Sequence, residues 1–255
     1  MSVSLPHAIA VWRRNASLYR RTWKVTILPN FFEPILYLAG LGIGIGAYIT
    51  EMDGVSYAAF LAPGLLCVAA MMGASFDATY NVFVRLNFEK AYDGMLTTPI
   101  EPDDILAGEI LWALTRTLIY GGGFYVVALG FGLIPMPFGL LALVAVPLAG
   151  LLFAAIGLAF TLRIKTIDMF SFYFTLFLTP LFLFSDVFFP LAERLPGYLL
   201  PVAEALPLLH PVRLTRLAFK GEFGWVMLWD LAYIAVASAV LVYFARQVMR
   251  QRLTS

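Results

Sequence analysis

The sequence has few charged residues and only one cysteine. Asp, Glu, Lys and Arg make up 13% of its 255 residues, whereas a soluble domain has about 25%. Such a chain cannot cover a water-exposed surface, so an all-α integral membrane protein is expected. A net charge of +1 excludes a strongly basic nucleic-acid-binding surface. Cys67 has no second cysteine with which to form an intrachain disulfide.

The motifs of common enzyme classes are also missing from the sequence. It contains no G-x-x-x-x-G-K-[ST] loop, no H-E-x-x-H, no G-x-S-x-G and no pair of cysteines. The two histidines, His7 and His210, are far apart in the chain and are expected on opposite sides of a membrane. We therefore expect no catalytic centre, no metal site and no cofactor bound by this chain.

Long apolar runs are what the sequence does contain. A helix needs about 20 mostly apolar residues to cross a membrane, and six segments qualify: 30–50, 56–84, 105–130, 138–162, 167–186 and 224–245. Lys and Arg gather before the first run, after the second and fourth, and at the C-terminus. The connections after the first and third runs have none. By the positive-inside rule both termini are expected in the cytoplasm.

Residues 5–26 are expected to form a helix that lies in the membrane interface. Apolar and aromatic side chains recur there every three or four positions, with arginines on other faces. An ordinary basic flank of the first span is the alternative.

Two connections are longer than turns. Residues 85–110 predict a short amphipathic helix, a break at proline, and a new helix with Asp103 and Asp104 at its N-terminus. Residues 185–224 are too apolar for a solvated loop and too rich in proline for a span. We expect short re-entrant helices on the external side, with a hairpin on the membrane surface as the alternative.

Four alternating glycines lie in the first apolar run: Gly40, Gly42, Gly44 and Gly46. Their G-x-G-x-G spacing differs from the G-x-G-x-x-G of a nucleotide-binding turn. It instead forms two overlapping small-xxx-small pairs, which predict a helix-packing surface. Simple helix flexibility is the alternative.

Three ionisable residues fall within apolar runs: Glu33, Asp77 and Arg116. Counting along each helix from its cytoplasmic flank places all three at a similar depth. An isolated charge is costly there, so we predict an ion-paired cluster that joins the first three spans. A relay for protons or substrate is the alternative.

The fifth apolar run is rich in aromatic and hydroxyl side chains. These side chains could line a path for an amphiphile, although lipid-facing phenylalanine is a common alternative. The candidate path residues are Phe170, Tyr173, Phe174, Phe177, Phe184, Ser185 and Asp186.

Several stretches together resemble the permease subunits of type-2 ABC exporters, and within them the NodJ-like family that exports nodulation lipo-oligosaccharides. They are "FEPILYLAGLGIGIG" (32–46), "VSYAAFLAPGLL" (55–66), "FEKAYDGMLTTPIEPDDILAGEI" (88–110) and "FFPLAERLPGYLLPVAEALPLLHPVRLTR" (188–216). One position departs from the family. It usually has Ser-Gly before the external Phe-Pro element, whereas here Asp186 follows Ser185. The Asp186 carboxylate could pair with Arg213 or Arg216.

The resemblance implies a homodimeric permease in the cell inner membrane, working with two copies of a separate ABC ATPase. ATP and Mg²⁺ would be bound by that partner and not by this chain. A coupling helix would contact the ATPase through Phe88, Glu89, Tyr92, Asp93, Met95 and Leu96.

We therefore expect the chain to export an amphiphile, either a lipo-oligosaccharide or a lipid-linked glycan. Export of hydrophobic drug-like compounds is the alternative within transport. A membrane-embedded lipid-modifying enzyme is disfavoured because the sequence has no catalytic constellation, and a scaffold would not explain the structured connection 85–110.

Overall fold

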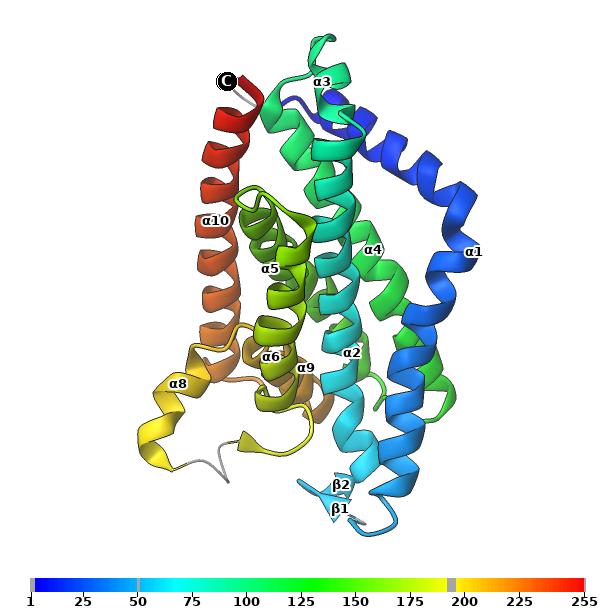
Figure 1. Cartoon of the computed structure of the whole chain (residues 1–255). Coiled ribbons are helices and arrows are strands. Elements are labelled where there is room, and N and C mark those ends of the chain that lie inside the picture. Colours follow the sequence, from blue (N-terminus) through cyan, green and yellow to red (C-terminus); the bar gives the residue numbers. More distant parts are fainter. Residues whose placement is uncertain (1–2, 50, 192–195, 255) are drawn as a thin grey trace.

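The protein is a bundle of long helices that run roughly along one direction (Figure 1). The structure, a computed structural model, describes residues 3–49, 51–191 and 196–254. Within these residues, five helices are long and apolar enough to span a membrane: Tyr57–Phe88, Pro102–Gly130, Phe138–Thr161, Ile167–Phe184 and Trp225–Leu253. The described part is helical as expected, apart from one small β-hairpin. Five of the six predicted apolar runs correspond to these helices, whereas the run 30–50 contains a shorter apolar helix, Ile35–Gly44.

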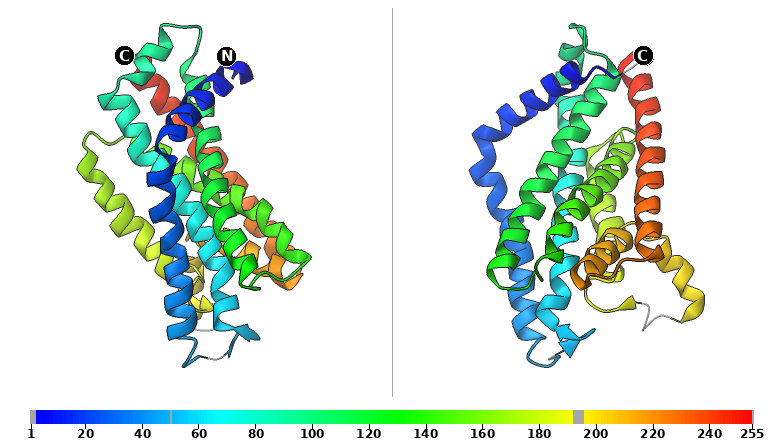
Figure 2. Two further views of the ribbon diagram at one scale, coloured as in Figure 1. Left: turned by 90° about the vertical axis from the view of Figure 1, so that its right-hand side faces the viewer. Right: turned by 180° about the vertical axis from the view of Figure 1, so that it is seen from behind.

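The first helix differs from the prediction. An interfacial helix over 5–26 and a separate span over 30–50 were expected, but α1 is one continuous helix of 40 residues, Leu5–Gly44. Figures 1 and 2 show it bent, with an oblique N-terminal arm and a lower half that runs beside α2. The sequence of α1 includes Pro29 and Pro34. A proline inside a helix removes a backbone hydrogen bond and allows a bend without ending the helix.

A short antiparallel hairpin, β1 (Glu51–Met52) and β2 (Val55–Ser56), leads into α2 (Tyr57–Phe76). The same helical rod continues through two π-helical segments, Asp77–Asn81 and Val84–Phe88. Wide π turns are uncommon and are frequent at functional sites, and both segments contribute charged side chains to the network described below.

The connection after this rod has the expected form. A short helix, α3 (Ala91–Leu96), is followed by α4 (Pro102–Gly130). The Glu101 side chain and Asp104 form a reciprocal capping box, and Asp103 also lies in the first turn of α4. Carboxylates there stabilise the helix N-terminus.

The remaining helices complete the bundle. They are α5 (Ala142–Thr161), α6 (Thr179–Phe184) after a π-helical turn at Phe172–Leu178, α8 (Leu200–Glu204), α9 (Leu209–Lys220) and α10 (Trp225–Thr254). We call the end with α3 and the C-terminus the α3 end, and the end with β1, β2 and α8 the hairpin end (Figure 1). The external connection predicted over 185–224 therefore contains α8 and α9; its residues 192–195 lie outside the described part.

Small residues hold α2, α4 and α5 close together. A Cβ placed on Gly150 of α5 would lie 2.5 Å from the Thr117 Cγ2 of α4, and one on Gly73 of α2 would lie 2.6 Å from the Tyr120 ring. Such close approach of helix backbones is typical of packing in membranes. This three-helix core fixes the positions of the polar residues at the α3 end.

Candidate functional site

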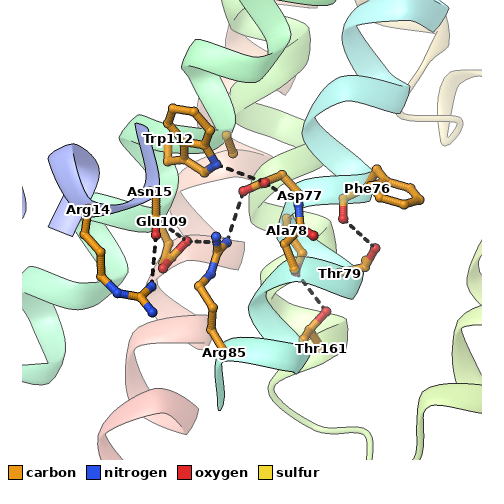
Figure 3. A network of polar contacts seen from close by, with 12 residues as sticks. Arg14, Asn15, Phe76, Asp77, Ala78, Thr79, Arg85, Glu109, Trp112 and Thr161 are labelled. Atoms are coloured by element: carbon orange, nitrogen blue, oxygen red, sulfur yellow. Dashed lines mark hydrogen bonds and ion pairs between the residues drawn. The ribbon is translucent and has the colours of Figure 1, made fainter. Parts of the chain in front are cut away.

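A buried polar network lies at the α3 end (Figure 3). Asp77 is at its centre: one carboxylate oxygen is 3.2 Å from Arg85 Nη2. The other oxygen accepts hydrogen bonds from Trp112 Nε1 at 3.0 Å and from Asn81 Nδ2 at 2.7 Å. Both oxygens of this buried carboxylate therefore have partners, which offsets the cost of removing them from water.

Glu109 is the second carboxylate of this network. It accepts hydrogen bonds from Arg85 at 2.8 Å, from Asn15 at 3.1 Å and from the Tyr92 hydroxyl at 2.9 Å. Its side chain is fully buried. Asn15 belongs to α1, Tyr92 to α3 and Glu109 to α4, while Arg85 comes from the extension of α2. One arginine thus joins two carboxylates, and the network ties four elements together.

The predicted cluster of Glu33, Asp77 and Arg116 is not what the described residues form. The ionic partner of Asp77 is Arg85, and the guanidinium of Arg116 lies over the rings of Tyr19 and Tyr120, at 4.4 and 4.7 Å. The Glu33 side chain lies outside the described part. Equal depth did not decide the pairing, because the direction in which each side chain leaves its helix matters as much.

The structure divides the six predicted ATPase-contacting residues into two sets. Tyr92 is fully buried, and Met95 and Leu96 are half-buried against an apolar cluster that includes Ile105. On the outside are Phe88, whose side chain is 66% exposed, together with Glu89 and Asp93. Tyr92 therefore faces the interior of this chain. The surface accessible to a partner is the one that carries Phe88, Glu89 and Asp93.

An apolar cavity of about 920 Å³ lies between α1, α2 and α6. From α2 it is lined by Leu65, Val68, Ala69 and Met72, which recur along one helix face. From α6 and the segment after it come Thr179, Phe182, Leu183, Phe188 and Phe189. Its walls are mostly apolar, so it suits a hydrophobic chain.

The predicted substrate-path residues are not among those that line this cavity. Phe170 and Tyr173 are buried in the bundle, where the Tyr173 hydroxyl is 3.1 Å from Ser75 Oγ. Phe174 and Phe177 are half-buried, Phe184 is exposed, and Ser185 is buried. From the same apolar run, the residues that line the cavity are Thr179, Phe182 and Leu183.

Asp186 forms one of the two pairings considered for it. Its carboxylate lies 3.1 Å from Arg216 Nε, and Arg216 also donates to the carbonyl of Phe60 at 2.9 Å. Burial raises the pKa of Asp186, and Arg216 opposes that shift. The backbone of Asp186 has φ of +62°, a conformation that glycine adopts freely. The glycine that the resemblance implies at this position would therefore adopt this backbone conformation without strain.

A second polar cluster lies at the hairpin end. Buried His210 has Nδ1 2.7 Å from Asp230 Oδ1 and Nε2 3.0 Å from the carbonyl oxygen of Glu204. Arg213 donates to both Asp230 and the Glu204 carboxylate. Hydrogen bonding to Arg213 lowers the pKa of Glu204. His210 is thus a structural partner that joins α9 to α8 and α10.

The four glycines of α1 and the turn after it have different surroundings. A Cβ on Gly42 would lie 3.2 Å from Ala58 Cβ on α2. Cβ atoms on Gly40 and Gly44 would have no described neighbour within 4 Å, and one on Gly46 would clash with the carbonyl of Gly42. The face with Gly40 and Gly44 is therefore open within the described chain.

The described part of the chain combines five helices long and apolar enough to span a membrane with a buried charge network and an apolar cavity. This combination is that of a polytopic membrane protein. A family model, "ABC-2 type transporter", matches residues 7–219. The chain therefore belongs to the ABC-2 type transporter family.

Proteins with similar sequences support this family assignment. Nodulation protein J of Rhizobium leguminosarum bv. viciae is 37% identical over 84% of this chain and 82% of its own length. Nodulation protein J of Sinorhizobium fredii is 33% identical over 97% and 94%. The inner membrane transport permease YadH of Escherichia coli is 27% identical over 91% and 93%. The resemblance to the NodJ-like permeases is thereby confirmed.

Proposed function

We propose that this chain is the permease subunit of an ATP-driven exporter that moves an amphiphile out of the cytoplasm or the inner leaflet. The observation that carries the proposal is the apolar cavity between α1, α2 and α6 in a chain of the ABC-2 family. A lipo-oligosaccharide or lipid-linked glycan has an acyl chain that suits these walls, and the relatives named Nodulation protein J favour this class of cargo.

In this proposal the protein lies in the cell inner membrane and crosses it six times. The lower half of α1 would be the first span, beside the five long apolar helices. The α3 end and both termini would be cytoplasmic, in agreement with the distribution of Lys and Arg. Parts of α8 and α9 would then form the re-entrant external elements, where buried His210 and Arg216 have partners within the protein.

Two ATPase subunits would bind two copies of this permease at the α3 end, and these subunits would bind the ATP and Mg²⁺. Movement of α3 would be transmitted inward by the hydrogen bond from Tyr92 to Glu109, and from there through Arg85 to Asp77. Since Glu109 is on α4 and Asp77 extends α2, this rigid connection would shift the helices beside the cavity.

Filling the cavity should block transport and leave the assembly intact. Val68 lines the cavity, so Val68→Phe would place a ring where the cargo chain is proposed to lie. We expect at least a tenfold lower rate of ATP-dependent export in proteoliposomes that contain the ATPase. The matched control is Val240→Phe, at a 61% exposed position on α10. Equal export by wild type and Val68→Phe would exclude this cavity as the cargo path.

The open face of α1 is the proposed contact with the second permease copy. Gly44→Leu should lower the fraction of dimer, measured by light scattering in detergent, because the added side chain would separate the two backbones. The monomer should fold normally, since this Cβ meets no described neighbour within 4 Å. Gly122→Leu, at a similarly open position of α4, is the control. If the Gly44→Leu variant dimerises normally, the face of α1 with Gly40 and Gly44 contacts lipid and not the second permease copy.

A further inference from the structure

Arg116 is a buried cation without a carboxylate partner among the residues that the structure describes. Its side chain is 1% exposed, and its Nε has no hydrogen-bond partner in that part of the chain. Within the described part, its guanidinium lies over the rings of Tyr19 and Tyr120, at 4.4 and 4.7 Å from their centroids. A charge at membrane depth is costly unless it is paired or functional, so an anionic ligand would stabilise this guanidinium.

Arg116 lies on the wall of a pocket of about 510 Å³ between the N-terminal arm of α1, the extension of α2, and α4. The wall includes three arginines, Arg21, Arg85 and Arg116, and two carboxylates, Asp77 and Glu89. Both carboxylates are already engaged: Asp77 with Arg85, and Glu89 with Arg14 at 3.3 Å. Arg116 inside and Arg21 at the exposed rim remain as positive groups for a ligand.

This polar pocket continues the apolar cavity. The same face of α2 supplies Met72 to the cavity and, one turn further, Phe76 to the pocket. On α4, Tyr120 lines the cavity, and Arg116, one turn earlier, lines the pocket and stacks on the Tyr120 ring. A polar region and an apolar region thus adjoin along one side of the bundle, with the polar region towards the α3 end.

We propose that the pocket around Arg116 binds the phosphate group of an inner-leaflet amphiphile whose apolar chain lies in the adjoining cavity. The planar guanidinium presents several N–H donors in a fork that matches phosphate oxygens. A soluble anion would not use the apolar cavity, whereas an amphiphile fills both regions. This inference depends on the proposed function in one respect: it takes the bound amphiphile to belong to the class of compounds that the protein exports.

Binding is tested on the full-length permease, purified in detergent and incubated with phosphatidylglycerol or phosphatidylcholine, with bound lipid counted by native mass spectrometry. Wild type should retain phosphatidylglycerol in preference to phosphatidylcholine. Arg116→Gln should reduce that preference about tenfold, equivalent to about 1.4 kcal/mol. Arg21→Gln, at the exposed rim, should reduce it in the same direction without affecting folding.

The control is Arg163→Gln, which removes the same charge at the α3 end from an exposed arginine stacked on Phe244, outside the pocket. Unchanged lipid preference in both Arg116→Gln and Arg21→Gln would overturn the proposal. Binding of inorganic phosphate that depends on Arg116 without retention of phosphatidylglycerol would overturn it too, because the ligand would then be a soluble anion. These readouts need no ATPase, so their failure is distinct from a failure of export.

Discussion

Replacing Arg85 with alanine is expected to lower the free energy of unfolding by about 3–5 kcal/mol, because the buried carboxylates of Asp77 and Glu109 would both lose their cation. Arg85 Nη2 lies 3.2 Å from Asp77 and 2.8 Å from Glu109, and all three side chains are at most 8% exposed. The measurement is thermal unfolding of the purified protein in detergent. Arg163→Ala, at an exposed arginine of the same end, should have little effect.

A double-mutant cycle then identifies the cause of the loss. Adding Glu109→Gln to Arg85→Ala should recover part of the lost stability, since one stranded charge becomes a neutral amide. Asp77→Asn should act in the same direction. If the effects of Arg85→Ala and Glu109→Gln simply add, the two side chains do not interact energetically and the network is not an ionic one.

The second large effect concerns the proposed ATPase contact. Changing Phe88 and Asp93 together to serine should abolish co-purification with the ATPase, because both side chains lie on the exposed side of the α3 region. Phenylalanine is among the aromatic residues enriched at protein–protein interfaces. Membrane insertion and thermal stability should remain at the wild-type level, since neither side chain is part of the buried core.

Two further variants make this test specific. Phe223→Ser removes an exposed phenylalanine at the hairpin end and should leave ATPase binding unchanged. Tyr92→Phe keeps the buried ring but removes the hydroxyl that donates to Glu109. It should retain the ATPase yet uncouple hydrolysis from export. Wild-type ATPase recovery with the Phe88 and Asp93 double variant would place the contact elsewhere.

The apolar runs and helix breaks could be predicted from the sequence because they depend on local physics. A spanning helix needs a minimum apolar length, and the start of α4 at Pro102 follows from proline and acidic residues in a first turn. The continuity of α1 could not be predicted in this way. Basic and aromatic residues before 26 indicated an interfacial helix, but nothing local showed whether the chain would bend or break at Pro29.

The partners of the buried charged residues could not be predicted from the sequence for a different reason. Depth along a helix can be counted, and it placed Asp77 level with Arg116, but the direction of each side chain depends on how the helices pack. Arg85 follows Asp77 by eight residues, about two helical turns, and so returns to the same face through the π-helical segments. In the sequence, Arg85 is one of the basic residues after the second apolar run, which indicate only the cytoplasmic side of the membrane.

Tyr92 is a second residue whose contacts depend on helix packing and could not be predicted from the sequence pattern. The resemblance implied that Phe88, Tyr92 and Leu96 all contact the ATPase, yet Tyr92 turns inward to Glu109 while Phe88 turns outward. The signal that could have separated them is the tyrosine hydroxyl, which needs a hydrogen-bond partner when buried. Glu109, an acidic residue inside the next apolar helix, was that partner.

The most direct test of export by this chain is ATP-driven movement of an amphiphile in proteoliposomes that contain only the permease and its ATPase. A fluorescent lipid-linked oligosaccharide is placed in the leaflet on the ATPase side, and its appearance in the opposite leaflet is followed by quenching with a membrane-impermeant reagent. The account predicts movement that requires ATP, the ATPase and an unblocked cavity between α1, α2 and α6. ATP hydrolysis by the assembled complex without movement of any amphiphile, or equal movement without the ATPase, would contradict it.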